Sequence, residues 1–353
     1  MNSDILRAGA TPRCRLGRHR AGRRMAGLAA TAALAVAALA LPGRTCAAAA
    51  PQRVTIATTT TNVQLLLPQI AQKQGYFAQH GIDANITLVK GDAVSVPALV
   101  SGSVQFAVMT ATPALVADSK GAHLRIISPL STYPQQIVMR TALAKQLGIT
   151  AASPLATKVA ALKGHTVAVM DVGGGLQYQL DAVLVSHGID PQAVPVIGMA
   201  PYSSELIALQ RGAVDVIAPA VPFGQLAVAK GYGIMIANIW GGEVPNLRGT
   251  PFEVMSVNQK WAATHTQTVA AVQAALQEAM TYLHAHPAAA AKLAHELQPY
   301  VPTEVQTAAV GTGAGFPTGT TITQQQFAAM QSFAKLSGAK TAAVTYQQAV
   351  WSH

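Results

Sequence analysis

Apolar and polar residues follow one another along the chain in a pattern that predicts strands alternating with helices. A strand over 54–58 leads to a helix over 63–79, and the glycine of the H-G-I-D motif is a good helix stop. The same reasoning predicts a strand over 86–89, a short helix ending at Gly102, a strand over 104–109, a helix stopped at Gly121 and a strand over 124–128. Alternating strands and helices indicate βαβ crossovers and a mostly parallel sheet.

This order of elements recurs about 110 residues later. The 24 residues from Ala98 align without gaps with those from Ala208 and are identical at seven positions, while H-G-I-D occurs at 80–83 and again at 187–190. Chance similarity in a chain rich in Ala and Val is the alternative, but two echoes in the same order at nearly the same offset favour shared architecture. The second copy predicts strands over 166–170, 194–197, 214–219 and 234–237, a helix over 176–187, and helices stopped at Gly212 and Gly231.

After Trp240 the pattern changes to one further strand from Pro251 and then mainly helices, over 268–285, 287–297 and 323–336. In the last helix an apolar stripe recurs at helical spacing, which is typical of core or lobe packing, and it consists of Phe327, Met330, Phe333 and Ala334. We therefore predict an α/β protein of two lobes with a mostly parallel sheet in each. Residues 51–133 and 245–353 would form the first lobe and 134–244 the second, joined by a two-strand hinge.

Residues 1–50 are typical of a cleaved signal peptide, with a basic segment, an Ala/Leu-rich apolar run over 25–41 and small residues over 47–50. The run is short for a helix that spans a membrane, which is the alternative. The pair Arg23-Arg24 leaves the twin-arginine and ordinary secretory routes both open. We expect the mature protein to be soluble in an extracytoplasmic space, and monomeric.

Removing this segment changes the charge. The chain carries a formal charge of +10, but residues 1–50 hold eight of its 24 basic residues and one of its 14 acidic residues, so the remainder is close to neutral. Without a clustered basic stripe, nucleic acid is not an expected partner. Both cysteines, Cys14 and Cys46, fall in the same segment, which leaves the exported protein without a disulfide or a thiol nucleophile.

Five segments in order resemble the periplasmic substrate-binding proteins of ABC importers for aliphatic sulfonates, taurine and nitrate, a family that also includes binders of thiamin pyrimidine precursors. They are G-Y-F-A-Q-H-G-I-D-A-N-I-T-L-V, V-S-G-S-V-Q-F-A, A-L-K-G-H-T-V-A-V, H-G-I-D-P and L-Q-R-G-A-V-D-V-I-A-P-A-V-P-F. The resemblance implies a type II periplasmic-binding fold that closes on a small-molecule ligand and presents it to an inner-membrane ABC permease. Where the family often has acidic or amide residues, this chain has Val221 and the loop T-A-T-P, so the substrate does not transfer with the resemblance.

Ligands of open parallel sheets bind beyond the carboxyl ends of the strands. Four loops there precede helices and offer unpaired backbone N–H groups, namely 59–62, 110–113, 173–177 and 220–223. None contains Lys or Arg, so an oxyanion would rest on helix dipoles and hydroxyls, and a neutral organic ligand is equally compatible. The candidate ligand-binding residues are Thr59, Thr60, Thr61, Asn62, Thr110, Thr112, Tyr133, Gly173, Gly174, Gly175, Gln177 and Phe223.

Several of these residues have structural alternatives. Asn62 or Thr61 is a candidate helix cap, and Pro113 suits the first position of a helix. Asp92 is interpreted as a cap of the helix after Gly91, whereas Asp171 beside the glycines could orient the loop or repel anions. The glycines are not a nucleotide fingerprint, because Tyr178 stands where G-x-G-x-x-G requires glycine.

No motif supports catalysis, a metal site or a cofactor. The chain lacks H-E-x-x-H and G-x-S-x-G, and the cysteine-rich motif of the pyrimidine-forming enzymes of this superfamily is absent. We therefore predict a binding protein and not an enzyme. Two alternatives stay open at this point: a chemosensory or signalling binding protein without its own importer, and, disfavoured, a pyrimidine-forming enzyme.

Overall fold

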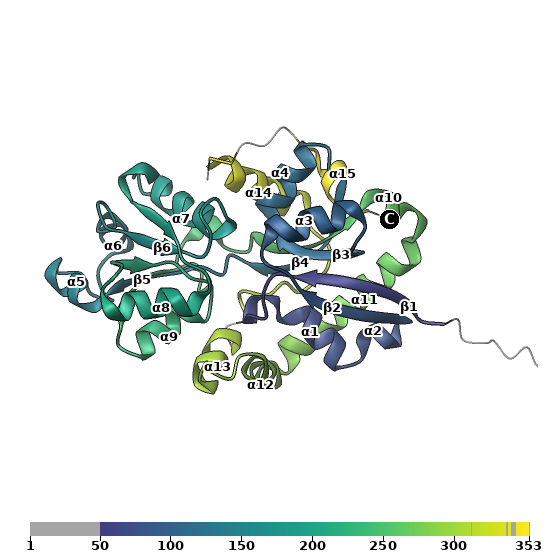
Figure 1. The fold of residues 1–353 in the computed structure, drawn as a ribbon, viewed down its shortest axis with the longest axis horizontal. Coiled ribbons are helices and arrows are strands. Elements are labelled where there is room, and N and C mark those ends of the chain that lie inside the picture. The colour runs from purple at the N-terminus through teal and green to yellow at the C-terminus, as the bar shows by residue number, and fades with distance from the viewer. Residues whose placement is uncertain (1–49, 312, 337, 340–343, 353) are drawn as a thin grey trace, which may run out of the picture. The chain divides into compact units, whose positions relative to one another are not determined.

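The computed structural model describes residues 50–311, 313–336, 338–339 and 344–352 (Figure 1). The predicted signal peptide, with Cys14 and Cys46, lies outside the described residues apart from Ala50. None of the helices described is long and apolar enough for a membrane crossing.

Two sheets of five strands form the framework, and the sequence predicts both sheets but only four strands of the second. The first has the order β2-β1-β3-β10-β4 and the second the order β7-β6-β8-β5-β9. The strands of the first are β1 (Gln52–Thr58), β2 (Ile82–Leu88), β3 (Phe106–Thr110), β4 (Leu124–Thr132) and β10 (Pro251–Asn258). Those of the second are β5 (Gln136–Arg140), β6 (Val167–Val169), β7 (Val196–Gly198), β8 (Val216–Ile217) and β9 (Gly233–Asn238).

The repeat is visible in the strand order. In each sheet the second strand in this order, β1 or β6, pairs in parallel with both of its neighbours. The fourth position in each sheet is antiparallel, and it is filled by β10 in the first sheet and β5 in the second. The chain therefore passes between the sheets twice, from β4 to β5 and from β9 to β10. The strands of each sheet fall within the residues predicted for its lobe, and the exact lobe boundaries stay a prediction.

Helices cover both faces of each sheet, and Figure 1 shows α3, α4, α14 and α15 opposite α1, α2 and α11 on the first. The helices of the first repeat unit are η1 (Val63–Leu65), α1 (Leu66–Lys73), α2 (Tyr76–Gln79), α3 (Asp92–Ser101) and α4 (Ala111–Ser119). Those packed on the second sheet are α5 (Thr141–Gln146), α6 (Leu155–Ala160), α7 (Gly175–Ser186), η2 (Pro191–Ala193), α8 (Tyr202–Arg211) and α9 (Phe223–Ala229). The C-terminal helices are η3 (Pro245–Leu247), α10 (Gln259–Thr264), α11 (Thr266–Ala285), α12 (Pro287–Leu297), α13 (Thr303–Gly311), α14 (Gln324–Leu336) and α15 (Tyr346–Ala349).

The glycine stops act as predicted. Gly81, Gly102, Gly188 and Gly212 all have φ between 71° and 79°, a left-handed conformation that glycine adopts without steric cost. The prediction of one helix over 63–79 is wrong, because Gly75 at φ 76° separates α1 from α2. Strand β5 was not predicted, because its short apolar run follows directly on the crossing segment.

The stripe of α14 packs as predicted. Phe327 and Met330 belong to a core on the first sheet, whereas Phe333 joins the core of the second sheet. The ring centroid of Phe333 lies 4.5 Å from that of Tyr133, with the two rings tilted by 44°. Helix α14 thus packs against both lobes.

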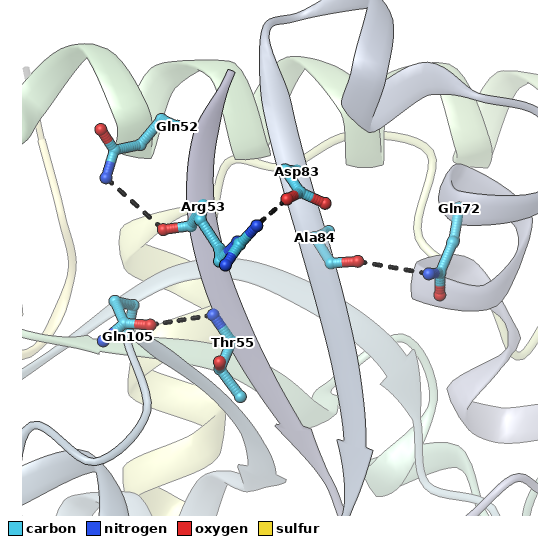
Figure 2. Close-up of polar contacts among 7 residues, drawn as sticks. All are labelled: Gln52, Arg53, Thr55, Gln72, Asp83, Ala84 and Gln105. Atoms are coloured by element: carbon cyan, nitrogen blue, oxygen red, sulfur yellow. Dashed lines mark hydrogen bonds and ion pairs between the residues drawn. The ribbon is translucent and has the colours of Figure 1, made fainter. Parts of the chain in front are cut away.

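Polar contacts at the outer edge of the first sheet are consistent with the parallel register of β1 and β2 (Figure 2). Arg53 Nε donates to Asp83 Oδ2 at 3.1 Å between two exposed side chains that are register partners, and the backbone N–H of Thr55 donates to Gln105 Oε1 at 2.8 Å. This edge carries no part of the cavity described next.

Candidate functional site

A cavity of about 640 Å³ lies where loops of the two sheets face each other. The first sheet contributes the segments that follow β1, β2 and β3, together with β10. The second contributes residues 170–176 after β6, with Tyr178 of α7 and Tyr202 of α8. Three of the four predicted loops therefore border one cavity at the carboxyl ends of parallel strands.

In the loop after β1, Thr59 and Thr60 line the cavity and Thr61 and Asn62 do not. Thr60 Oγ1 accepts a hydrogen bond from the backbone N–H of Asn62 at 3.2 Å, which fixes the turn. The Asn62 side chain is buried and accepts from Gln298 Nε2, and it makes no capping hydrogen bond to η1. The interpretation of Asn62 as a side-chain cap is wrong, since its amide points into the core.

Thr110 joins the loop after β3 to the start of α3. Its hydroxyl donates to Asp92 Oδ2 at 2.6 Å and its backbone N–H donates to Asp92 Oδ1 at 3.3 Å. Asp92 therefore accepts hydrogen bonds from Thr110 across the site and does not cap its own helix. That helix has Gly91 at its N-cap position and no side-chain capping hydrogen bond. Helix α4 begins at Ala111, so Pro113 is its third residue and not its first as predicted. Pro113 lines the cavity, whereas Thr112 is buried and does not.

The glycine loop brings the second sheet close to the first. A Cβ atom at Gly175 would lie 2.9 Å from Phe252 Cζ and 3.0 Å from Thr110 Oγ1, so only glycine permits this approach. Gly173 has φ 78°, and its N–H donates to Gln177 Oε1 at 2.7 Å. Gly173, Gly174 and Gly175 all line the cavity, and Gln177, which holds the loop, does not.

Two predicted aromatic contacts lie behind the cavity wall. Tyr133 is 2% exposed, and its ring centroid lies 5.3 Å from that of Phe252, which does line the cavity. Phe223, on the fourth predicted loop, is 1% exposed, and its ring centroid lies 4.7 Å from that of Tyr202. Loop 220–223 is therefore absent from the cavity lining, and its place in the wall is taken by Tyr202.

A buried acidic residue on β10 completes the wall. Glu253 is 3% exposed, and its Oε1 accepts from Gln64 Nε2 at 3.4 Å, while its Oε2 has no hydrogen-bond partner among the described residues. Glu205, behind Tyr202, is fully buried, and neither of its carboxyl oxygens has a hydrogen-bond partner among the described residues.

The titration of these acids reflects their burial. Burial raises the pKa of Asp92 from 3.8 to about 6, the two hydrogen bonds from Thr110 lower it, and the charge of Asp171 raises it. Burial and the nearby charge of Asp92 raise the pKa of Glu253 well above 4.5. Burial, with a smaller effect of Asp171, does the same to the pKa of Glu205. Ionisation of these acids in the folded protein is therefore costly.

Sequence reasoning missed Glu253, Gln64, Tyr202 and Phe252 as lining residues. One signal was available for Glu253, because an acid in the otherwise uncharged strand P-F-E-V-M-S-V-N is unusual in a buried position. Nothing local marks Gln64 or Tyr202. In the part of the chain that the structure describes, no group of three or more His, Cys, Asp or Glu side chains could hold a metal ion.

Residues 47–298 match the model of the NMT1-like family. Among solved structures, the alkanesulfonate-binding protein SsuA from Xanthomonas axonopodis pv. citri, bound to MOPS, is 21% identical with a TM-score of 0.67, covering 86% of this chain and 99% of that one. The periplasmic aliphatic sulphonate-binding protein SsuA from Escherichia coli is 18% identical with a TM-score of 0.63, covering 81% and 91%.

The periplasmic nitrate-binding protein NrtA from Synechocystis PCC 6803 is 18% identical with a TM-score of 0.59, covering 72% of this chain and 69% of that one. No curated protein sequence matches the chain. At these identities the solved structures establish a shared fold, that of periplasmic binding proteins.

Proposed function

Because the chain belongs to the NMT1-like family and has the fold of periplasmic binding proteins, we propose that it is an exported solute-binding protein of an ABC importer. It captures one small ligand between its lobes and delivers it to an inner-membrane permease. The observation that carries this proposal is the cavity walled by loops of both sheets, where one ligand can contact both.

The cavity suits a small molecule. Its volume of about 640 Å³ falls in the range of about 300–1,000 Å³ typical of ligand sites. Its lining mixes a few polar side chains with an apolar wall that includes Met170, Leu176 and Phe252. We propose that Thr59, Thr60, Thr110 and the backbone of Gly173–Gly175 contact the ligand.

The two crossing segments make a hinge between the lobes. A ligand that contacts both lobes binds the closed arrangement more tightly than the open one, and it shifts the population towards closure by this difference in affinity. Thr61, Asn62, Thr112, Tyr133, Gln177 and Phe223 are proposed to support the site by holding the lining residues, because none of them reaches the cavity.

A thermal-shift panel tests ligand capture. Purified protein is heated with sulfonates, taurine, nitrate, thiamin pyrimidine precursors, aromatic acids and organic amines. A ligand at 100 times its Kd should stabilise the protein by about 2.7 kcal/mol. A panel in which no compound raises Tm would contradict solute binding.

Two further readouts separate the proposed role from its alternatives. Mass spectrometry after overnight incubation should recover the stabilising compound unchanged, and turnover would favour an enzyme. Uptake of the labelled compound should fall when the gene is deleted, while unchanged uptake with lost chemotaxis would favour a signalling receptor.

A further inference from the structure

The polar end of the cavity is acidic. Asp92 from α3, Asp171 from the loop after β6 and Glu253 from β10 all line it. Lys90 and Lys120 also belong to the lining, but both side chains are exposed at its margin. Of the described residues that line the cavity, none is an arginine or a histidine. Glu253 is buried, Asp92 is half-buried and Asp171 is exposed, so the charged groups that reach the buried part of the site are the carboxyls of Glu253 and Asp92.

Two backbone N–H groups near the starts of α4 and α7 already have acceptors. Helix α4 begins after Thr110, and the N–H of Thr110 donates to the carboxylate of Asp92. In the glycine loop the N–H of Gly173 donates to Gln177 Oε1. Oxygens of the protein thus occupy two of the donors that an oxyanion would use, which weakens the expectation of an oxyanion that comes from the loop pattern alone.

The Glu253 carboxyl group indicates which ligand group the site could accept. It is 97% buried, it lines the cavity, and its Oε2 has no donor among the described residues. A buried carboxylate oxygen without a donor is destabilising, and a positively charged N–H group is the partner that relieves both the missing hydrogen bond and the repulsion from Asp92. An anionic ligand would add a further negative charge instead.

We propose that the cavity binds an organic cation, with a protonated amine or amidinium group against Glu253 and Asp92 and an apolar body against Phe252, Met170 and Leu176. This inference rests on the proposed function and names the class of its ligand. Thr110 holds the Asp92 carboxylate by two hydrogen bonds, so the anionic end of the site is formed before the ligand arrives.

Matched compounds test the head group separately from the body. Benzylamine, benzamidine and agmatine are compared with phenylmethanesulfonate, benzoate, nitrate, benzyl alcohol and calcium chloride by thermal shift at pH 8. At least one organic cation should raise Tm, whereas benzyl alcohol and the anions should not.

The outcomes distinguish the two proposals. Stabilisation by a sulfonate, by nitrate or by calcium, with none by the organic cations, would overturn the cation assignment and leave solute capture intact. Stabilisation by no compound of this set or of the wider panel would overturn both.

Variants then locate the bound cation. Glu253→Gln and Asp92→Asn should each weaken binding of the stabilising cation at least tenfold by calorimetry. Glu304→Gln makes the same chemical change on an exposed helix residue outside the cavity lining, and its affinity should match the parent protein. Melting curves of each variant without ligand show whether it is folded. Parent-like affinity in both folded cavity variants would overturn the assignment.

The pH dependence of binding is an independent readout. Because the carboxylates must be ionised to attract a cation, affinity should rise with pH through the titration of Asp92. The titratable groups around the cavity that would shape the curve are Lys90, Lys120, Asp171, Tyr178, Tyr202 and Glu253 in its lining, and Glu205 behind Tyr202. Affinity that falls as pH rises would contradict the proposal.

Discussion

Replacing Asp92 with Asn should stabilise the ligand-free protein at pH 8. Burial raises the pKa of Asp92 from 3.8 to about 6, so ionisation of this group is easier in the unfolded chain than in the folded one. The stability associated with the protonated carboxyl is present in full below pH 3.8 and is lost as pH rises through about 6. Because the asparagine amide cannot ionise, the variant does not lose this contribution.

The magnitude follows from the pKa. A rise from 3.8 to about 6 corresponds to roughly 3 kcal/mol for ionising Asp92 in the folded protein. An amide replaces the hydrogen bonds to Thr110 imperfectly, which we take to cost about 1 kcal/mol. A net gain of about 2 kcal/mol should raise Tm by about 3 °C for a chain of this size.

The assay is thermal unfolding without ligand at pH 4, 6 and 8. The Tm advantage of Asp92→Asn should grow from pH 4 to pH 8. Asp83→Asn is the matched control, because Asp83 is an exposed acid whose ion pair with Arg53 lies on the outer sheet edge (Figure 2). A Tm difference that is the same at all three pH values, or a variant that is less stable at pH 8, would refute the reasoning.

Three further predictions concern packing and hydrogen bonding near the site. Gly175→Ala should weaken ligand binding about tenfold or more, because the added Cβ would lie 2.9 Å from Phe252 Cζ and force the lobes apart. Calorimetry measures this change in affinity, and Gly311→Ala is the control because a Cβ at Gly311 would meet no atom within 4 Å. Gly315→Ala should lower stability by about 1–3 kcal/mol in chemical denaturation, because its Cβ would overlap the buried Trp240 ring; an unchanged midpoint would contradict the packing. Thr110→Val should raise the pKa of Asp92 further, because the Thr110 hydroxyl lowers it, and carboxyl carbon NMR titration should show this; a lower pKa would contradict the described hydrogen bond.

Much of the fold could be predicted because its signals are local. Helix ends at Gly102 and Gly212 follow from a backbone conformation that glycine favours, and the repeat predicts the same succession of strands and helices in both lobes. The break between α1 and α2 was missed because apolar periodicity continues across Gly75. Strand β5 was missed because its pairing with β8 and β9 joins residues far apart in the chain.

The site could be predicted only in part, because some of its contacts also join residues far apart in the chain. Its loops follow from the rule that ligands bind at the carboxyl ends of parallel strands, and Thr59, Thr60, Thr110 and the glycines do line the cavity. The acidic end depends on the pairing of β10 with β3, which places Glu253 opposite Thr110 in the sheet. No local sequence pattern shows this pairing or the hydrogen bonds from Thr110 to Asp92, so Asp92 was interpreted as a helix cap.

A crystal structure with the compound that raises Tm most would test directly whether the protein captures a ligand between its lobes. We expect one molecule in the cavity, in contact with Thr110 on one side and with Gly173–Gly175 on the other, and with a nitrogen within hydrogen-bonding distance of Glu253 Oε2. A compound bound outside this cavity, or held by one lobe alone, would contradict the proposed mode of capture.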